Sequence, residues 1–256
     1  MSEYFRDEYE FMDSNGYTIE DAWYPRVTRI VSIKSKPGLH NFYKEMGSEE
    51  AAKAVSNRSA EEGTLVHEVV EELLLGLNPS VPSSIAPAVT AFREFAAKTP
   101  IKVAPDYIER RILHPEHRYA GTVDALAVID GKFGILDIKT SQSIYRDYNL
   151  QTAAYIEALK KTFPTLHTRW ILRIDQVSKC QICGATKRTK GGREKIRNNG
   201  SRVVCATSAH EWGAVQGVIE LQEFPFWKSD FEAFLGAKRL WEWENEWWLK
   251  KIGYLK

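Results

Sequence analysis

The sequence predicts an α/β (α+β) fold with a central mixed β-sheet, flanking helices and a small cysteine-rich insert. Three observations support this prediction. Helical periodicity covers much of residues 48–98 and returns in residues 229–251. Short apolar runs typical of strands lie between these helical regions. The three cysteines all follow residue 179, between the last two predicted strands.

The first third of the chain is expected to be mainly helical. Residues 1–24 are predicted to form a loose arm, and residues 27–33 a short strand or docking segment. Residues 48–76 read as helical, with apolar side chains at helical spacing around His67. Gly63 marks either a helix start or a close backbone contact, and Gly76 a helix end. A proline-rich loop then precedes a predicted helix over residues 86–98.

Three strands are predicted over residues 107–113, 120–129 and 133–139. Asp130-Gly131 is a strong signal for a two-residue hairpin turn. With that turn Asp124 lies opposite Asp137, and opposed Cβ atoms are only about 4.5–5.5 Å apart. Lys139 follows Asp137 by two residues and therefore shares its face of the strand.

These charged residues interrupt apolar strands, which is unusual unless the charges are paired or bind a metal. Two adjacent carboxylates repel each other unless a proton or a cation lies between them. Asp124, Asp137 and Lys139 therefore favour a site for Mg²⁺ or Mn²⁺ and a scissile phosphate. The alternative is an ordinary exposed Asp137–Lys139 pair on an edge hairpin.

Other polar residues are ambiguous by themselves. His67 alone on a helix is more often a core or boundary residue than a ligand. Gln151 and Tyr155 share one face of a helix expected to end at Phe163. The alternative interpretation of this pair is a polar patch on an amphipathic helix. Glu109 could approach the site, but a surface ion pair with Arg110 or Arg111 is the favoured interpretation.

The order of four short motifs resembles one nuclease superfamily. GTLVHE (63–68), GTVD (121–124), LDIKT (136–140) and QTAAY (151–155) are similar to the motifs of PD-(D/E)XK nucleases. The narrower resemblance is to the RecB-like branch, with CRISPR-associated and phage-type exonucleases. It covers residues 60–160 closely and implies a restriction-endonuclease-like core in a single domain, 1–256, with an insert at 178–213.

The resemblance also implies roles for individual residues. His67, Asp124, Asp137 and the Ile138 carbonyl would bind one or two Mg²⁺ or Mn²⁺ ions. The implied catalytic residues are Asp124, Asp137, Lys139, Gln151 and Tyr155. The implied activity is DNA hydrolysis, by exonuclease action, in recombination, repair or phage DNA processing. A structure-selective endonuclease and a non-catalytic nucleic-acid-binding module are the alternatives.

The cysteines suggest a second metal site. Cys180 and Cys183 form a CxxCG knuckle, and Cys205 and His210 follow downstream. Four such ligands suit a closed tetrahedral structural Zn²⁺ site. The alternative is two reduced thiols and an unrelated buried Cys205. Some members of the resembled branch hold an iron–sulfur cluster with four cysteines, but this chain has three.

Basic residues crowd the segment between these ligands. Residues 187–202 are expected to form an exposed flexible loop that contacts DNA phosphates, or else a merely solvated one. The candidate DNA-binding residues are Lys187, Arg188, Lys190, Arg193, Lys195, Arg197 and Arg202. Because the net charge is only +1, a DNA-binding surface has to come from such local patches.

Length and composition set the outer limits. A chain of 256 residues with 43% apolar content can form one large domain. It has no apolar run of about 18 residues, no signal-like N-terminus and no disulfide framework, so a cytoplasmic protein without a membrane span is expected. It also lacks a Walker motif, so any helicase or recombination partner would be a separate protein. Of the four tryptophans in residues 241–248, at least half are expected in the core.

Overall fold

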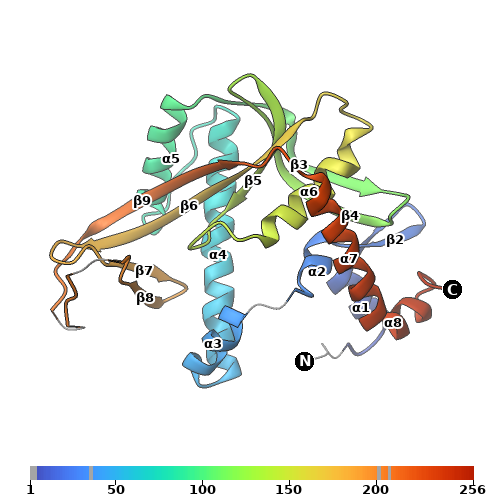
Figure 1. Cartoon of the computed structure of the whole chain (residues 1–256), viewed down its shortest axis with the longest axis horizontal. Coiled ribbons are helices and arrows are strands. Elements are labelled where there is room, and N and C mark those ends of the chain that lie inside the picture. Colours follow the sequence, from blue (N-terminus) through green and yellow to red (C-terminus); the bar gives the residue numbers. More distant parts are fainter. Residues whose placement is uncertain (1–4, 35–36, 201–202, 207–208) are drawn as a thin grey trace.

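The computed structural model describes residues 5–34, 37–200, 203–206 and 209–256, without the side chains of 37, 39 and 40. In this part of the chain a mixed seven-stranded sheet forms the centre of the molecule (Figure 1). Its order is β3-β4-β5-β6-β7-β8, and β9 also pairs with β6. The strands are β3 (Ile101–His114), β4 (Tyr119–Ile129), β5 (Lys132–Lys139), β6 (Thr168–Cys180), β7 (Thr186–Lys190), β8 (Arg193–Arg197) and β9 (Trp212–Glu223). Only β5 and β6 pair in parallel, so the predicted mixed sheet is confirmed.

Helices cover both faces of the sheet. Alternate β5 residues separate the two cores: Ile135 packs in one and Leu136 in the other. On the Leu136 side lie α4 (Glu49–Leu74) and α5 (Ala86–Lys98). On the Ile135 side lie α2 (Val27–Val31), α6 (Asp147–Lys160) and α7 (Lys228–Glu244). The crossover that parallel pairing requires is α6, which connects β5 to β6 (Figure 1).

The N-terminal segment is part of the core, which corrects the predicted loose arm. It forms α1 (Glu8–Asn15) and a small sheet of β1 (Gly16–Ile19) and β2 (Ala22–Pro25). Phe11 is fully buried and stacks on Trp248, which follows α7 in the short helix α8 (Glu246–Lys251). Residues 27–31 are helical, with Ile30 fully buried. The aromatic side chains of both chain ends thus bury one another.

The tryptophans of the C-terminal helices divide as expected. Trp241 is buried and Trp248 packs against the core, whereas Trp243 and Trp247 are 71% and 64% exposed.

Helix α4 forms one continuous helix within the predicted range 48–76. It begins after Ser48, whose hydroxyl accepts the Ala51 N–H, and runs without interruption through Gly63. Gly63 is therefore not a helix start but a point of close contact. A Cβ there would lie 2.9 Å from Thr140 Oγ1. The helix ends as predicted near Gly76, which has a φ of +76°.

The cysteine-rich insert continues the sheet. Strands β6 and β9 extend together beyond the core, and Cys180 pairs with Trp212 near their ends (Figure 1). Between them β7 and β8 form a hairpin with Gly191 and Gly192 at its turn, both at positive φ. The basic segment is thus a paired ribbon through Arg197, not the predicted flexible loop. None of the described helices is both long and apolar enough to cross a membrane.

Candidate active site and metal centre

The acidic hairpin forms with the predicted register. Ile129 pairs with Lys132, and the ladder continues to Ala125 opposite Leu136. Asp130 and Gly131 have φ values of +50° and +75°, as a primed two-residue turn requires. The ladder stops before the two aspartates. The carboxylate of Asp124 instead accepts the Ile138 N–H at 2.6 Å and so reaches across to β5.

Asp137 is a buried carboxylate with little compensation. Its side chain is 1% exposed, and neither oxygen accepts a hydrogen bond of acceptable geometry. Lys139 Nζ forms an ion pair with Oδ2 at 2.5 Å. Burial, with a smaller contribution from the Asp124 carboxylate, raises the pKa of Asp137 to about 6 against the opposing effect of Lys139. Such a group needs a proton or a cation.

Lys139 remains an ammonium at this site. Burial acts to lower its pKa, but the Asp137 and Asp124 carboxylates outweigh burial and the net shift is upward. Its Nζ also lies 5.2 Å from the ring centre of Tyr148 on α6. The sequence therefore places a fixed positive charge beside two carboxylates.

Helix α4 brings His67 to the same place. His67 Nδ1 is 3.9 Å from Asp124 Oδ2. Burial and the Lys139 ammonium lower the pKa of His67 to about 4, so the imidazole is neutral near pH 7. A neutral imidazole has a lone pair available for a metal ion.

The donor set fits a hard divalent cation in its chemistry. It offers carboxylate oxygens, one imidazole and an unsatisfied buried carboxylate. The three side chains of His67, Asp124 and Asp137 do not, however, bring ligand atoms within 4.8 Å of one another. Lys139 and the Ile138 N–H hold the two carboxylates instead. A bound ion would have to displace these contacts.

Helix α6 closes the other side of the site. Gln151 Nε2 donates to the Tyr155 hydroxyl at 2.9 Å, as their four-residue spacing predicts. Tyr155 is buried against Gly121, where a Cβ would lie 2.7 Å from the Tyr155 ring. Burial, with a contribution from Asp137, raises the pKa of Tyr155 well above its ordinary value. The close contact with the Tyr155 ring explains why glycine occupies position 121 in the strand that carries Asp124.

A cavity of about 600 Å³ opens beside His67. Two carboxyl groups that sequence reasoning did not assign to the site, Glu71 and Glu109, line it. Burial and the neighbouring Glu109 raise the pKa of Glu71 to about 8, and burial also raises the pKa of Glu109. Glu109 lines the cavity beside Glu71, which corrects its prediction as a surface ion-pair partner. It has a φ of +48° beside an irregularity in β3. Pro105, inside that irregular stretch, was a sequence signal for it.

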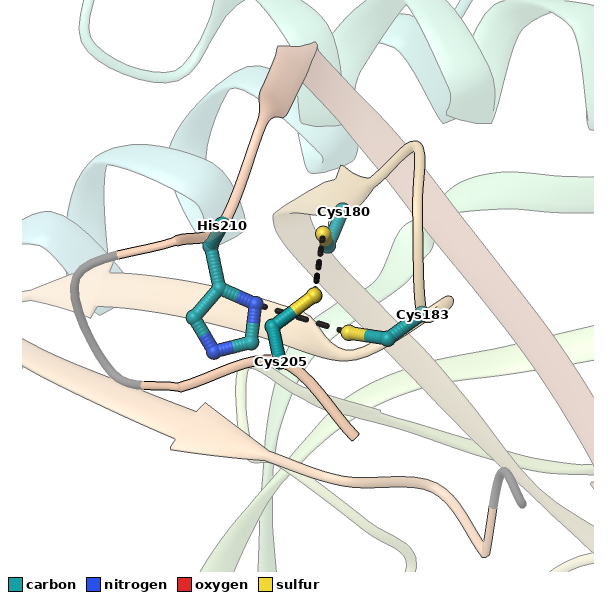
Figure 2. A group of neighbouring side chains, drawn as sticks. All are labelled: Cys180, Cys183, Cys205 and His210. Carbon is teal, nitrogen blue, oxygen red and sulfur yellow. Dashed lines mark hydrogen bonds between the residues drawn. The ribbon is translucent and has the colours of Figure 1, made fainter. Parts of the chain in front are cut away.

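The insert brings the four predicted zinc ligands together (Figure 2). The ligand atoms of Cys180, Cys183, Cys205 and His210 all lie within 4.8 Å of one another. Cys180 Sγ is 4.0 Å from Cys205 Sγ, and Cys183 Sγ is 3.4 Å from His210 Nδ1. Among the described residues this is the one group of three or more candidate ligands so closely spaced. Cys205 is therefore not an unrelated buried thiol.

The electrostatics of the cluster favour a cation. Although burial opposes it, hydrogen bonds from the Cys183 backbone and His210 lower the pKa of Cys180 to about 6. Burial and the two adjacent thiols raise the pKa of Cys205 to about 12. Three thiols this close cannot all ionise without a neutralising ion. The ligand types and their proximity fit a tetrahedral ion such as Zn²⁺.

The predicted DNA-binding cations are mostly engaged within the protein. Lys187 pairs with Glu194 at 3.2 Å, Arg188 with Asp175 at 2.8 Å, and Arg193 with Glu45. Lys190 donates to Thr140, directly after Lys139. Lys195 and Arg197 lie on β8, and Arg197 Nη1 is 3.5 Å from Ser143 Oγ. Arg202 lies outside the described residues.

The comparisons with known proteins assign no family. No family model matches the chain, and no curated protein matches it either.

Proposed function

We propose that this protein is a Mg²⁺- or Mn²⁺-dependent DNA nuclease. The observation that carries the proposal is the Asp137 carboxylate, which is buried, contacts the Lys139 ammonium and accepts no hydrogen bond of acceptable geometry. Structural carboxylates at such depth are normally hydrogen-bonded. A carboxylate left unsatisfied beside a second acid, an imidazole and an ammonium suits metal-assisted phosphodiester hydrolysis.

Each residue has a defined part in this proposal. Asp124 and Asp137 would hold the metal, with neutral His67 and the Ile138 carbonyl as further ligands. When bound, the ion would lower the pKa of its water and offset charge on the phosphate. Lys139 would position the attacking water and stabilise charge on the phosphoryl oxygens.

Two further parts complete the proposal. Gln151 and Tyr155 would hold Lys139 or the DNA backbone by hydrogen bonds. The cysteine–histidine cluster would hold a structural Zn²⁺ ion, outside the chemistry. Exonuclease action rests on the resemblance to RecB-like nucleases, as does a role in recombination, repair or phage DNA processing.

The test compares two lysines on one strand. Lys139→Ala removes the ammonium at the site, whereas Lys132→Ala removes an exposed lysine of β5 that pairs with Glu223. End-labelled linear DNA and circular DNA, single- and double-stranded, are incubated with Mg²⁺, with Mn²⁺ or with neither. We expect metal-dependent cleavage that falls by about 10²–10³-fold in Lys139→Ala and is unchanged in Lys132→Ala.

The same assay separates the alternatives. Cleavage of circles would favour a structure-selective endonuclease over an exonuclease. Binding without cleavage would favour a non-catalytic nucleic-acid-binding module. A folded Lys139→Ala variant that cleaves as well as the unmodified protein would refute the assignment of the site.

A further inference from the structure

The tip of the β7–β8 hairpin reaches the end of β5, the strand that carries Asp137 and Lys139. Lys190 Nζ donates to the Thr140 carbonyl at 2.6 Å and to Thr140 Oγ1 at 2.7 Å. Thr140 directly follows Lys139 and lines the cavity beside His67. At the turn, the Gly191 N–H donates to Glu62 Oε1 of α4 at 3.0 Å. The insert therefore contacts both elements that carry the proposed site.

Two glycines permit this close approach. A Cβ at Gly191, whose φ is +60°, would lie 2.3 Å from Ser59 Oγ and 2.4 Å from the Val55 carbonyl oxygen. A Cβ at Gly63 would lie 2.9 Å from Thr140 Oγ1 and 3.8 Å from Lys190 Nζ. Real Cβ atoms essentially never approach other atoms within 3.0 Å. The hairpin tip, α4 and the end of β5 thus converge closely, and neither Gly191 nor Gly63 has room for a side chain.

A guanidinium fixes the base of this contact. Arg188 Nε donates to both oxygens of Asp175 on β6, at 2.8 and 2.9 Å. Its Nη2 donates to the same Thr140 carbonyl at 2.9 Å. Because Arg188 and Lys190 are two apart on β7, they lie on one face of the strand. Arg188 and Lys190 of β7 therefore both donate to the carbonyl of Thr140, directly after β5.

The Lys190 ammonium is not fully satisfied by the hydrogen bonds that it donates. An ammonium has three N–H donors, and both recorded Lys190 bonds go to Thr140. Partial burial of an ammonium is costly unless it is paired, and no carboxylate forms an ion pair with Lys190 among the described residues. Its Nζ lies against Thr140, which lines the cavity, so an anion bound next to Thr140 would pair with it.

We infer that Lys190 is a further residue of this site, a positioning residue that fixes Thr140 and supplies a second ammonium to the phosphate backbone of bound nucleic acid. This inference rests on the proposed function for its substrate. The cysteine–histidine cluster anchors the hairpin that carries Lys190, since Cys180 ends β6 and Cys183 precedes β7.

The test uses a matched pair of lysines on the insert. Lys190→Ala removes the inferred contact, Lys190→Arg preserves its charge, and Lys179→Ala is the control. Lys179 is exposed and lies on β6 opposite Thr186 of β7. Binding of a fluorescent single-stranded oligonucleotide is titrated with salt in Ca²⁺, and cleavage is measured separately in Mg²⁺.

We expect Lys190→Ala to reduce the slope of log K against log salt by about 0.7, the loss of one phosphate contact on a single strand. We also expect a fall of about tenfold or more in kcat/KM. Lys190→Arg should keep most of the salt slope and of the kcat/KM, because it keeps the positive charge. A lysine with only a structural role would not depend on that charge. Lys179→Ala should leave the kcat/KM within about twofold of the unmodified protein, the size expected for a peripheral charge.

The two readouts keep this inference separate from the proposed function. A reduced salt slope in a protein that never cleaves DNA would support Lys190 and refute the nuclease proposal. A slope and kcat/KM unchanged in Lys190→Ala would overturn the inference while leaving the nuclease intact. Equal losses in Lys190→Ala and Lys179→Ala would also overturn it.

Discussion

Replacing Asp137 by asparagine should stabilise the metal-free protein. Burial raises the pKa of Asp137 from its ordinary 3.8 to about 6. A shift of about 2 pKa units corresponds to about 3 kcal/mol. Because the folded pKa is the higher one, the folded state binds the proton more tightly, and stability falls as the pH rises from 3.8 through about 6. Above that range the ionised carboxylate carries the full penalty, which the neutral amide avoids.

The assay is thermal unfolding of metal-free protein at about pH 7.5 and about pH 4. At the higher pH, Asp137→Asn should raise the unfolding free energy by about 3 kcal/mol, or Tm by about 6–12 °C for a chain of this size. At the lower pH the difference should nearly vanish. Mn²⁺ at about 100 times its Kd should add about 2.7 kcal/mol to the unmodified protein and nothing to the variant.

Asp175→Asn is the matched control. Asp175 is also buried, but it pairs with Arg173 and Arg188 and lies outside the proposed metal ligands. Its loss should lower stability, since two guanidinium groups lose a partner, and should preserve the Mn²⁺ effect. A destabilised Asp137→Asn variant that Mn²⁺ still stabilises would refute the reasoning.

Three further perturbations have defined outcomes. Glu71→Gln should flatten the pH dependence of urea unfolding between about pH 4.5 and 8, because the raised pKa of Glu71 makes stability fall across that range; an unchanged profile would contradict it. Metal analysis should find about one zinc per chain in the unmodified protein and less in Cys183→Ser, which should also have a lower Tm. Zinc retained in Cys183→Ser would remove Cys183 from the site. Gly191→Ala should impair both stability and DNA cleavage through its clash with Ser59. Gly200→Ala, also at positive φ but with open space, should lower only stability, so equal cleavage losses would argue against the hairpin contact.

The acidic hairpin was predictable because its turn is local. Asp130-Gly131 fixes the register, and the register brings Asp124 and Asp137 to the same end of two strands. The final contact was not predictable, since the Asp124 carboxylate competes with the ladder for the Ile138 N–H. Helical spacing likewise predicted the Gln151–Tyr155 bond.

The remaining site residues depend on tertiary contacts. Glu109 enters the cavity through an irregularity in β3, and Lys190 arrives on a hairpin that composition alone made look like a loop. One signal for that hairpin was present: Gly191-Gly192 is a turn pair between two short polar strands. The burial of Phe11 was hidden because its partners lie at the opposite end of the chain.

The pairing of Cys180 with Trp212 has a consequence for protein engineering. Residues 181 and 211 are also bonded, through the Gln181 N–H and the Glu211 carbonyl at 2.9 Å. The segment between them leaves and re-enters at adjacent points, so a tight turn grafted there would convert β6 and β9 into a simple hairpin. Excision would leave the pairing among β3, β4, β5, β6 and β9 in place, but it would remove the contacts that the segment makes with Thr140, Glu62 and Glu45.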